Sequence, residues 1–209
     1  MPFCVNTSMT KIYTAFPDIV IEGNLALTAE IETQLNNAIL AEADSGSVEE
    51  TNFGFRTNEY VPLNDTLKKL QQLVLNSFFK DIAVSMPSVK NTKTNIELVR
   101  PNLISIKPMS NLPASFKRNR FYTGCVWLQT TNKGSHVYIE SPTAKKYSTA
   151  EGLMDYNIFI KPAKFKYAFW PAHLRAGFTP NNSMTNTVAM QFSFTVAVPW
   201  DGRPAPLKK

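Results

Sequence analysis

The sequence contains few cysteines: Cys4 and Cys125 are the only two in 209 residues. Two thiols so far apart in sequence favour reduced cysteines in a cytosolic compartment over a disulfide framework. Cys125 lies in an apolar run with no histidine near it in sequence, so we interpret it as a small core residue and not as a nucleophile. The hydrophobic core must then supply the stability, and a chain of 209 residues can bury roughly 70% of its unfolded surface.

Long hydrophobic runs are also missing. No uninterrupted apolar segment approaches the roughly 20 residues that span a bilayer, and residues 1–8 lack the basic and apolar regions of a secretory signal. We therefore expect a soluble protein without a membrane partner. The 22 basic and 16 acidic residues give a net charge of +6. A charge of about 2 to 8 simply keeps small domains soluble, so charge alone does not predict nucleic-acid binding.

Several common catalytic motifs are absent. The sequence has no glycine-rich phosphate loop, no cysteine pair at zinc spacing and no Gly-any-Ser-any-Gly elbow. Ser183 and Ser193 have no histidine close in sequence. These patterns give no support to phosphate-loop, zinc or serine-nucleophile chemistry.

The first part of the chain is predicted to contain a strand pair and two helices. Residues 11–17 and 19–21 form short apolar runs interrupted by Pro17, which is typical of strands broken at a proline. Thr28 is a candidate cap for a helix that extends to about residue 43, and Asn64 for a second that extends to about residue 84. One apolar face supports each helix: Ile31, Leu35 and Ile39 in the first; Leu67, Leu70, Val74 and Phe78 in the second.

From about residue 94 the pattern changes to short apolar runs separated by turn residues, which is typical of an antiparallel sandwich or barrel. The runs are 96–99, 103–106, 121–129, 136–139, 158–160, 165–170 and 188–198. We expect a mainly β fold with N-terminal helices (α+β), in a single domain over residues 1–209. Residues 1–93 would supply strands and helices that back the sheet, residues 94–199 the β core, and residues 200–209 an extended, proline-rich arm.

One segment carries a motif with a changed residue. Residues 170–181 read Trp-Pro-Ala-His-Leu-Arg-Ala-Gly-Phe-Thr-Pro-Asn. This segment resembles the metal-site loop of the phage and cyanophage 2-oxoglutarate/Fe(II) oxygenase-like family, and residues 54–58 extend the match. The resemblance implies a double-stranded β-helix core, a jelly-roll or cupin-like architecture, behind N-terminal helices. Ala176 stands where the family has an iron-binding histidine, and a methyl group cannot bind a metal.

The other ligand positions implied by the resemblance have also changed. The family's first metal-binding strand carries His, any residue, His or Asp, and then Ser-Gly some five residues later. Here Thr123-Gly124 takes the Ser-Gly position, and Ser115 and Lys117 take the ligand positions. A lysine ammonium has donors only. The arginine that anchors 2-oxoglutarate, counted without a gap, corresponds to Thr187, whose hydroxyl cannot form a two-pronged pair with a carboxylate.

A relocated metal site is the alternative. A non-heme iron site of this class needs two histidines and a carboxylate. The chain has two histidines, and His136 and Glu140 would share one face of a strand. His136, Glu140 and His173 are therefore an alternative ligand set, with Asp155 as another candidate carboxylate. We favour instead two partly exposed histidines that interact with backbone or water.

Basic residues interleaved with aromatic ones resemble a groove that follows a nucleic-acid backbone. They lie at residues 117–120, 145–146 and 161–166. The interpretation we favour is that they are solvated outer faces of strands, where lysines prevent edge pairing.

The resemblance to a phage family and the changed ligands together predict a non-catalytic protein without a cofactor. It would be a structural or assembly component of a phage virion, associated with neck, tail or capsid and assembled in the host cytoplasm. Its partners would be other phage structural proteins and copies of itself, contacted by Trp200, Arg203 and Lys208 of the tail. The alternatives are an active dioxygenase that uses Fe(II) and 2-oxoglutarate with relocated ligands, and a nucleic-acid-binding accessory protein.

Overall fold

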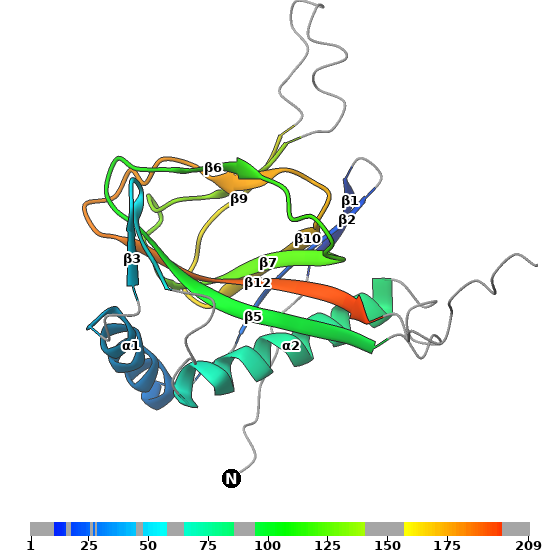
Figure 1. Cartoon of the computed structure of the whole chain (residues 1–209), viewed down its shortest axis with the longest axis horizontal. Helices are drawn as coiled ribbons and strands as arrows, with labels where there is room; N and C mark the ends of the chain where they lie inside the picture. Colours follow the sequence, from blue (N-terminus) through cyan, green and yellow to red (C-terminus); the bar gives the residue numbers. More distant parts are fainter. Residues whose placement is uncertain are drawn as a thin grey trace, which may run out of the picture.

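The computed structural model describes residues 11–15, 18–25, 27, 29–44, 48–57, 65–85, 95–140 and 157–197. In this part of the chain, two antiparallel sheets face each other and two helices lie along the outer face of the larger sheet (Figure 1). The prediction of a mainly β fold with N-terminal helices is confirmed. None of the helices in the described part is long and apolar enough to cross a membrane.

The N-terminal elements alternate between strands and helices. They are β1 (Lys11–Ala15), β2 (Asp18–Asn24), α1 (Ala29–Asp44), β3 (Val48–Thr51), β4 (Gly54–Thr57) and α2 (Asp65–Ser85). Both predicted helices are present within one or two residues of their expected ends. The strands of this part join the larger sheet at both of its edges, so they extend the sheet as well as back it.

The remaining elements that the structure describes are all strands. They are β5 (Asn95–Ile106), β6 (Leu112–Ser115), β7 (Tyr122–Gln129), β8 (Val137–Ile139), β9 (Ile158–Ile160), β10 (Lys166–Pro171), β11 (Ala176–Phe178) and β12 (Thr187–Ala197). The larger sheet has the order β1-β2-β10-β7-β12-β5-β4-β3, and the smaller one has the order β6-β11-β8-β9.

The two apolar runs predicted around Pro101 form one strand. In β5, Val99 pairs with Ser193 of β12 and Asn102 pairs with Gln191, with a register shift between them. Pro101 has no N–H to donate, and such a bulge is one of the few places where a sheet accepts a proline. The apolar runs 96–99 and 103–106, given separately in the sequence, are therefore parts of one strand.

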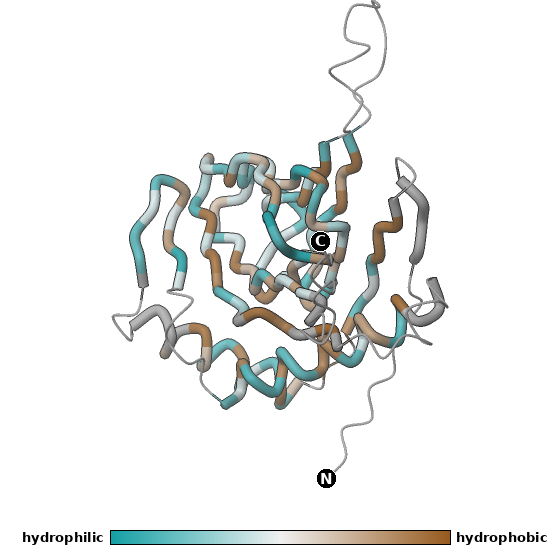
Figure 2. Tube along the Cα trace, turned by 45° about the vertical axis from the view of Figure 1, so that its right-hand side comes forward, coloured by the Kyte–Doolittle hydropathy of each residue, from teal (hydrophilic) through white to brown (hydrophobic). Residues whose placement is uncertain are grey.

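Side chains of the central strands alternate between two cores. In β7, Val126 and Leu128 pack with the helices, whereas Cys125 and Trp127 pack between the two sheets. Figure 2 shows hydrophobic positions alternating with hydrophilic ones along α2, whose apolar face completes the first core. Cys125 is fully buried, and burial raises the pKa of its thiol far above the ordinary value, which confirms it as a core residue.

Candidate functional site

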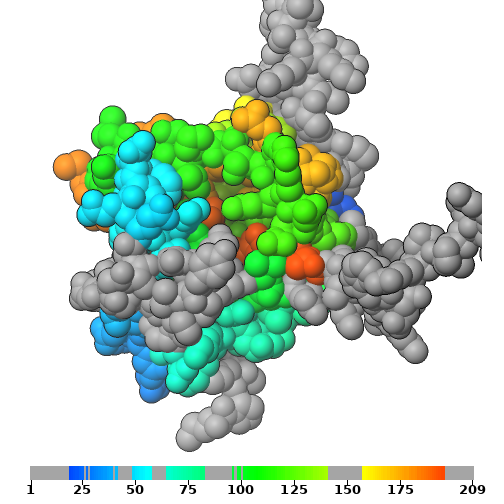
Figure 3. All heavy atoms as spheres, in the orientation of Figure 1, coloured from blue at the N-terminus to red at the C-terminus, as the bar shows by residue number. Residues whose placement is uncertain are grey.

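A cavity of about 100 Å³ lies between the two sheets. Its apolar wall comes mainly from β5, β6 and β11. Its polar lining consists of Arg56, Ser115, Lys117, Thr123, Trp170 and Gln191. The β3–β4 hairpin, cyan in Figure 3, forms the edge of this face beside the green residues of β5 and β6, so that Arg56 of β4 belongs to the wall.

Three of the four changed ligand positions meet at this cavity. Ser115 of β6 pairs directly with Ala176 of β11, and both residues line the cavity together with Lys117. The local fold explains the meeting, because residues 115 and 176 occupy adjacent antiparallel strands of the smaller sheet. The backbone N–H of Lys117 donates to the carbonyl of Ala172 (3.0 Å), which holds the segment after β6 against the loop before β11.

Thr187 lies outside the cavity. It is fully buried at the start of β12, and its hydroxyl accepts a hydrogen bond from the backbone N–H of Ser135 (3.0 Å). Gln191 lies four residues further along the same strand and does line the cavity. Four residues of a strand span about 13 Å. The residue reached by counting without a gap from Ala176, Thr187, therefore lies well away from the part of β12 that lines the cavity.

The side chains at the ligand positions do not fit Fe(II). The ammonium of Lys117 has three donors and no acceptor, Ala176 has no heteroatom, and Ser115 offers one neutral hydroxyl. A facial site for non-heme iron requires two imidazoles and a carboxylate. In the part of the chain that the structure describes, no three His, Cys, Asp or Glu residues are grouped closely enough to hold a metal.

The polar lining of the cavity is cationic. Of the described residues that line it, Arg56 and Lys117 carry positive charge and none is acidic. A guanidinium nitrogen of Arg56 lies 3.4 Å from a carboxylate oxygen of Glu49, which is itself largely exposed to solvent. Trp170 is 5% exposed, and its Nε1–H has no hydrogen-bond partner among the described residues. In the described lining, one unpaired donor, the indole N–H of Trp170, and two positive charges therefore border the space in which the resemblance would put a metal.

Comparisons with solved structures find the same architecture. The carbocyclase SnoK from nogalamycin biosynthesis, a non-heme alpha ketoglutarate dependent enzyme, is similar over 84% of this chain and 78% of its own, with a TM-score of 0.61 and 10% identity. A Pseudomonas putida prolyl-4-hydroxylase is similar over 84% and 92%, with a TM-score of 0.58 and 9% identity. An oxidoreductase of the 2OG-Fe(II) oxygenase family from Burkholderia pseudomallei is similar over 84% of both chains, with a TM-score of 0.57 and 9% identity.

The chain has the fold of the 2-oxoglutarate/Fe(II) oxygenases. The expected double-stranded β-helix is thereby confirmed. No family model matches the sequence, and no curated protein matches it either. Identities near a tenth show the fold, and whether the activity is retained depends on the residues of the site.

The relocated ligand set does not assemble on this oxygenase fold. Val137 and Ile139 of β8 point into the core between the sheets, so His136 and Glu140 lie on the outer, partly exposed face. Glu140 forms an ion pair with Arg175 (3.1 Å), and His173 is exposed. Among the described residues, these side chains are not grouped as a metal site. His136 and Glu140 thus share a face, as alternation along a strand implies, and this face is opposite the one that packs between the sheets. Asp155 lies outside the described residues.

The neighbours of His136, and not its pKa, argue against a role as a metal ligand. Partial burial lowers the pKa of its imidazole, and the positive charges of Lys161 and Lys166 lower it further. The neutral imidazole is thereby favoured, but it has no carboxylate or second imidazole beside it in the described part of the fold. The backbone N–H of His136 donates to the hydroxyl of Thr179 (2.9 Å), which fixes this residue as part of the connection into β8.

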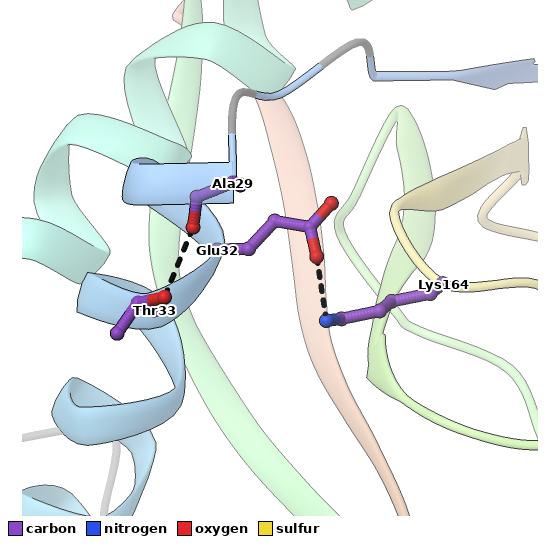
Figure 4. A network of polar contacts seen from close by, with 4 residues as sticks. All are labelled: Ala29, Glu32, Thr33 and Lys164. Atoms are coloured by element: carbon purple, nitrogen blue, oxygen red, sulfur yellow. Dashed lines mark hydrogen bonds and ion pairs between the residues drawn. The ribbon is translucent and has the colours of Figure 1, made fainter.

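The basic clusters of the sequence separate into paired and unpaired groups. Lys164 forms an ion pair with Glu32 of α1 (2.9 Å; Figure 4), beside a bond from the Thr33 hydroxyl to the Ala29 carbonyl. Lys166 pairs with Glu22 of β2 (2.9 Å). These lysines are neutralised by neighbouring elements and are poorly suited to bind phosphates. Residues 145–146 lie outside the described part of the chain.

The other basic group has no carboxylate partner in the described part of the chain, although Arg120 donates to the carbonyl of Asn119 (3.3 Å) and Arg118 lies over the ring of Phe116 (5.5 Å). A second hollow of about 150 Å³ is lined by Lys117, Arg118 and Arg120, and also by Gln191 and Ser193. It shares Lys117 and Gln191 with the first cavity.

The sequence analysis did not identify Arg56, Trp170 and Gln191 as site residues. The only signal for Arg56 and Trp170 was that residues 54–58 and 170–181 both carry the resemblance. The tail residues Trp200, Arg203 and Lys208 lie outside the described part.

Proposed function

We propose that this chain is a non-catalytic protein of the oxygenase fold that acts through binding, as a structural or assembly component of a phage virion. One observation supports the non-catalytic assignment: Ser115, Lys117 and Ala176 meet at one cavity in place of a metal-binding set. With these residues the fold still provides a rigid scaffold, but it lacks the side chains that bind iron in the reaction with 2-oxoglutarate.

The phage role rests on the resemblance of residues 115–127 and 170–181 to a phage family. In this proposal the chain is assembled in the host cytoplasm and contacts other virion proteins or copies of itself. The aromatic and basic residues of the tail, Trp200, Arg203 and Lys208, are the proposed contacts, because an aromatic side chain on a short proline-rich segment suits a partner's pocket.

Two measurements test the two halves of this proposal. Incubation of the purified protein with Fe(II), ascorbate and 2-oxoglutarate is expected to release no succinate above a protein-free blank, with a known dioxygenase run in parallel as the positive control. Quantitative mass spectrometry of purified particles is expected to find the chain in a fixed copy number. Succinate release would support the active-oxygenase alternative, and absence from particles would contradict the virion role.

A further inference from the structure

Positive charge is in excess in the lining of the cavity, and the one carboxylate partner among the described residues, Glu49 beside Arg56 (3.4 Å), lies outside that lining. Arg56 and Lys117 contribute permanent positive charge, and no acidic side chain is among the described lining residues. Lys117 is only partly exposed and has no carboxylate partner in the described part of the chain. Removing a cation from water costs free energy unless an opposite charge is nearby, so this arrangement favours a bound anion.

Trp170 supplies an independent sign of a missing acceptor. The indole is almost completely buried and lines the cavity, and its Nε1–H has no protein partner among the described residues. Buried side-chain donors in folded proteins are nearly always paired. Thr123 pairs in register with Trp170, but its hydroxyl donates to the carbonyl of Phe192 (2.7 Å) and does not accept from the indole. Because Trp170 lines the cavity, a water molecule or a bound ligand there supplies the acceptor that the described residues do not.

A second, basic hollow lies beside the cavity. It shares the lining residues Lys117 and Gln191 with the first, and is also lined by Arg118 and Arg120, which are both exposed. Positive charge along a cleft raises the local concentration of anions and their rate of association. Arginine side chains bind carboxylate and phosphate groups through two parallel hydrogen bonds.

We propose that this cavity is a metal-independent binding site for a small oxyanion, a carboxylate or a phosphate. Arg56 and Lys117 hold the anionic group, the indole N–H of Trp170 donates to it, and Arg118 and Arg120 attract it from the second hollow. Lys117 thus places a positive charge at a position where the family that this chain resembles binds its metal. The proposal concerns ligand binding alone and does not depend on the virion role.

The test is a titration of the full chain in excess EDTA at constant ionic strength, with inorganic phosphate and with succinate as the two probes. Binding is followed by the indole N–H signals in a proton–nitrogen correlation spectrum. The chain has three tryptophans, so three such signals are expected. The Trp170→Phe variant keeps an aromatic ring at this position and removes the N–H donor. The signal that disappears from its spectrum is that of Trp170. We expect that signal to shift saturably with at least one probe, and the preferred probe to distinguish a phosphate site from a carboxylate site.

Variants test the roles of the cations. Lys117→Met is expected to weaken binding roughly tenfold or more, because it removes one charge-assisted contact and keeps the aliphatic stem. Lys133→Met is the matched control, since this exposed lysine lies on the turn after β7 and outside both hollows, and it is expected to bind like the wild type. The proposal is overturned if neither probe shifts the Trp170 signal, if binding requires added Fe(II), or if both lysine variants lose binding equally.

Discussion

Replacing Phe78 by alanine is expected to lower the free energy of unfolding by about 3–5 kcal/mol. Phe78 is completely buried on the inner face of α2. Its ring stacks on Phe194 of β12 at 4.0 Å between centroids and meets the edge of Phe169 of β10 at 5.0 Å. The substitution removes the aromatic group that joins the helix to two central strands and leaves a cavity that rigid strands cannot fill.

Phe79 offers a matched control for this substitution. It is the next residue along α2, has the same side chain and is 36% exposed. Phe79→Ala is expected to lower the free energy of unfolding by only about 1 kcal/mol, because its ring is partly exposed and its aromatic contact among the described residues is with Phe78 alone (5.8 Å). Chemical denaturation of both variants measures the difference. Equal destabilisation by the two variants would contradict the packing of α2 against the sheet.

Replacing Trp127 by alanine is expected to cost about as much, roughly 3–5 kcal/mol, in the core between the sheets. Trp127 is fully buried, its Nε1–H donates to the Ser135 carbonyl (3.2 Å), and its ring meets Phe178 edge-on at 6.4 Å. The variant loses the buried ring and leaves a buried carbonyl without its donor. Because Phe178 also lines the cationic cavity, the substitution is expected to loosen that cavity as well.

Phe159 of β9 is the control for the second core. It is 55% exposed on the outer face of the smaller sheet. Phe159→Ala is therefore expected to leave the thermal midpoint nearly unchanged, whereas Trp127→Ala lowers it by several degrees or more. A Trp127→Ala protein as stable as the Phe159→Ala protein would show that the two sheets do not share the core described for them.

The fold was predictable where the sequence carries strong periodic signals. Both helices follow from four-residue apolar spacing and a candidate cap, and long strands such as β7 and β12 follow from their apolar residues. The strands that were missed are β3, β4, β6 and β11. They are three or four residues long, and β11 reads Ala-Gly-Phe, so neither length nor β-branched residues reveal it. Its strand character comes from pairing with both β6 and β8, which is tertiary information.

The site was predictable only in part, for a related reason. Resemblance located Ser115, Lys117 and Ala176, and the structure places all three around one cavity. The resemblance did not identify Arg56, which adds a second positive charge, or Trp170, which supplies the free donor. These two residues come from opposite parts of the larger sheet, so only the fold brings them to the same cavity. Counting along the chain led to Thr187, which does not line the cavity, whereas Gln191 of the same strand does; a count along the sequence does not say which residues of a strand border a cavity.

The central claim is that the oxygenase fold is retained here with side chains that cannot hold a divalent metal. The most direct test is a titration with Mn(II) as a spectroscopic substitute for Fe(II), followed by the loss of its free electron paramagnetic resonance signal. The wild type and the Ala176→His single variant are expected to show no saturable site, because one imidazole leaves the other ligand positions unsuitable. The triple variant Ser115→His/Lys117→Asp/Ala176→His is expected to bind the metal. Stoichiometric binding by the wild type would contradict the account.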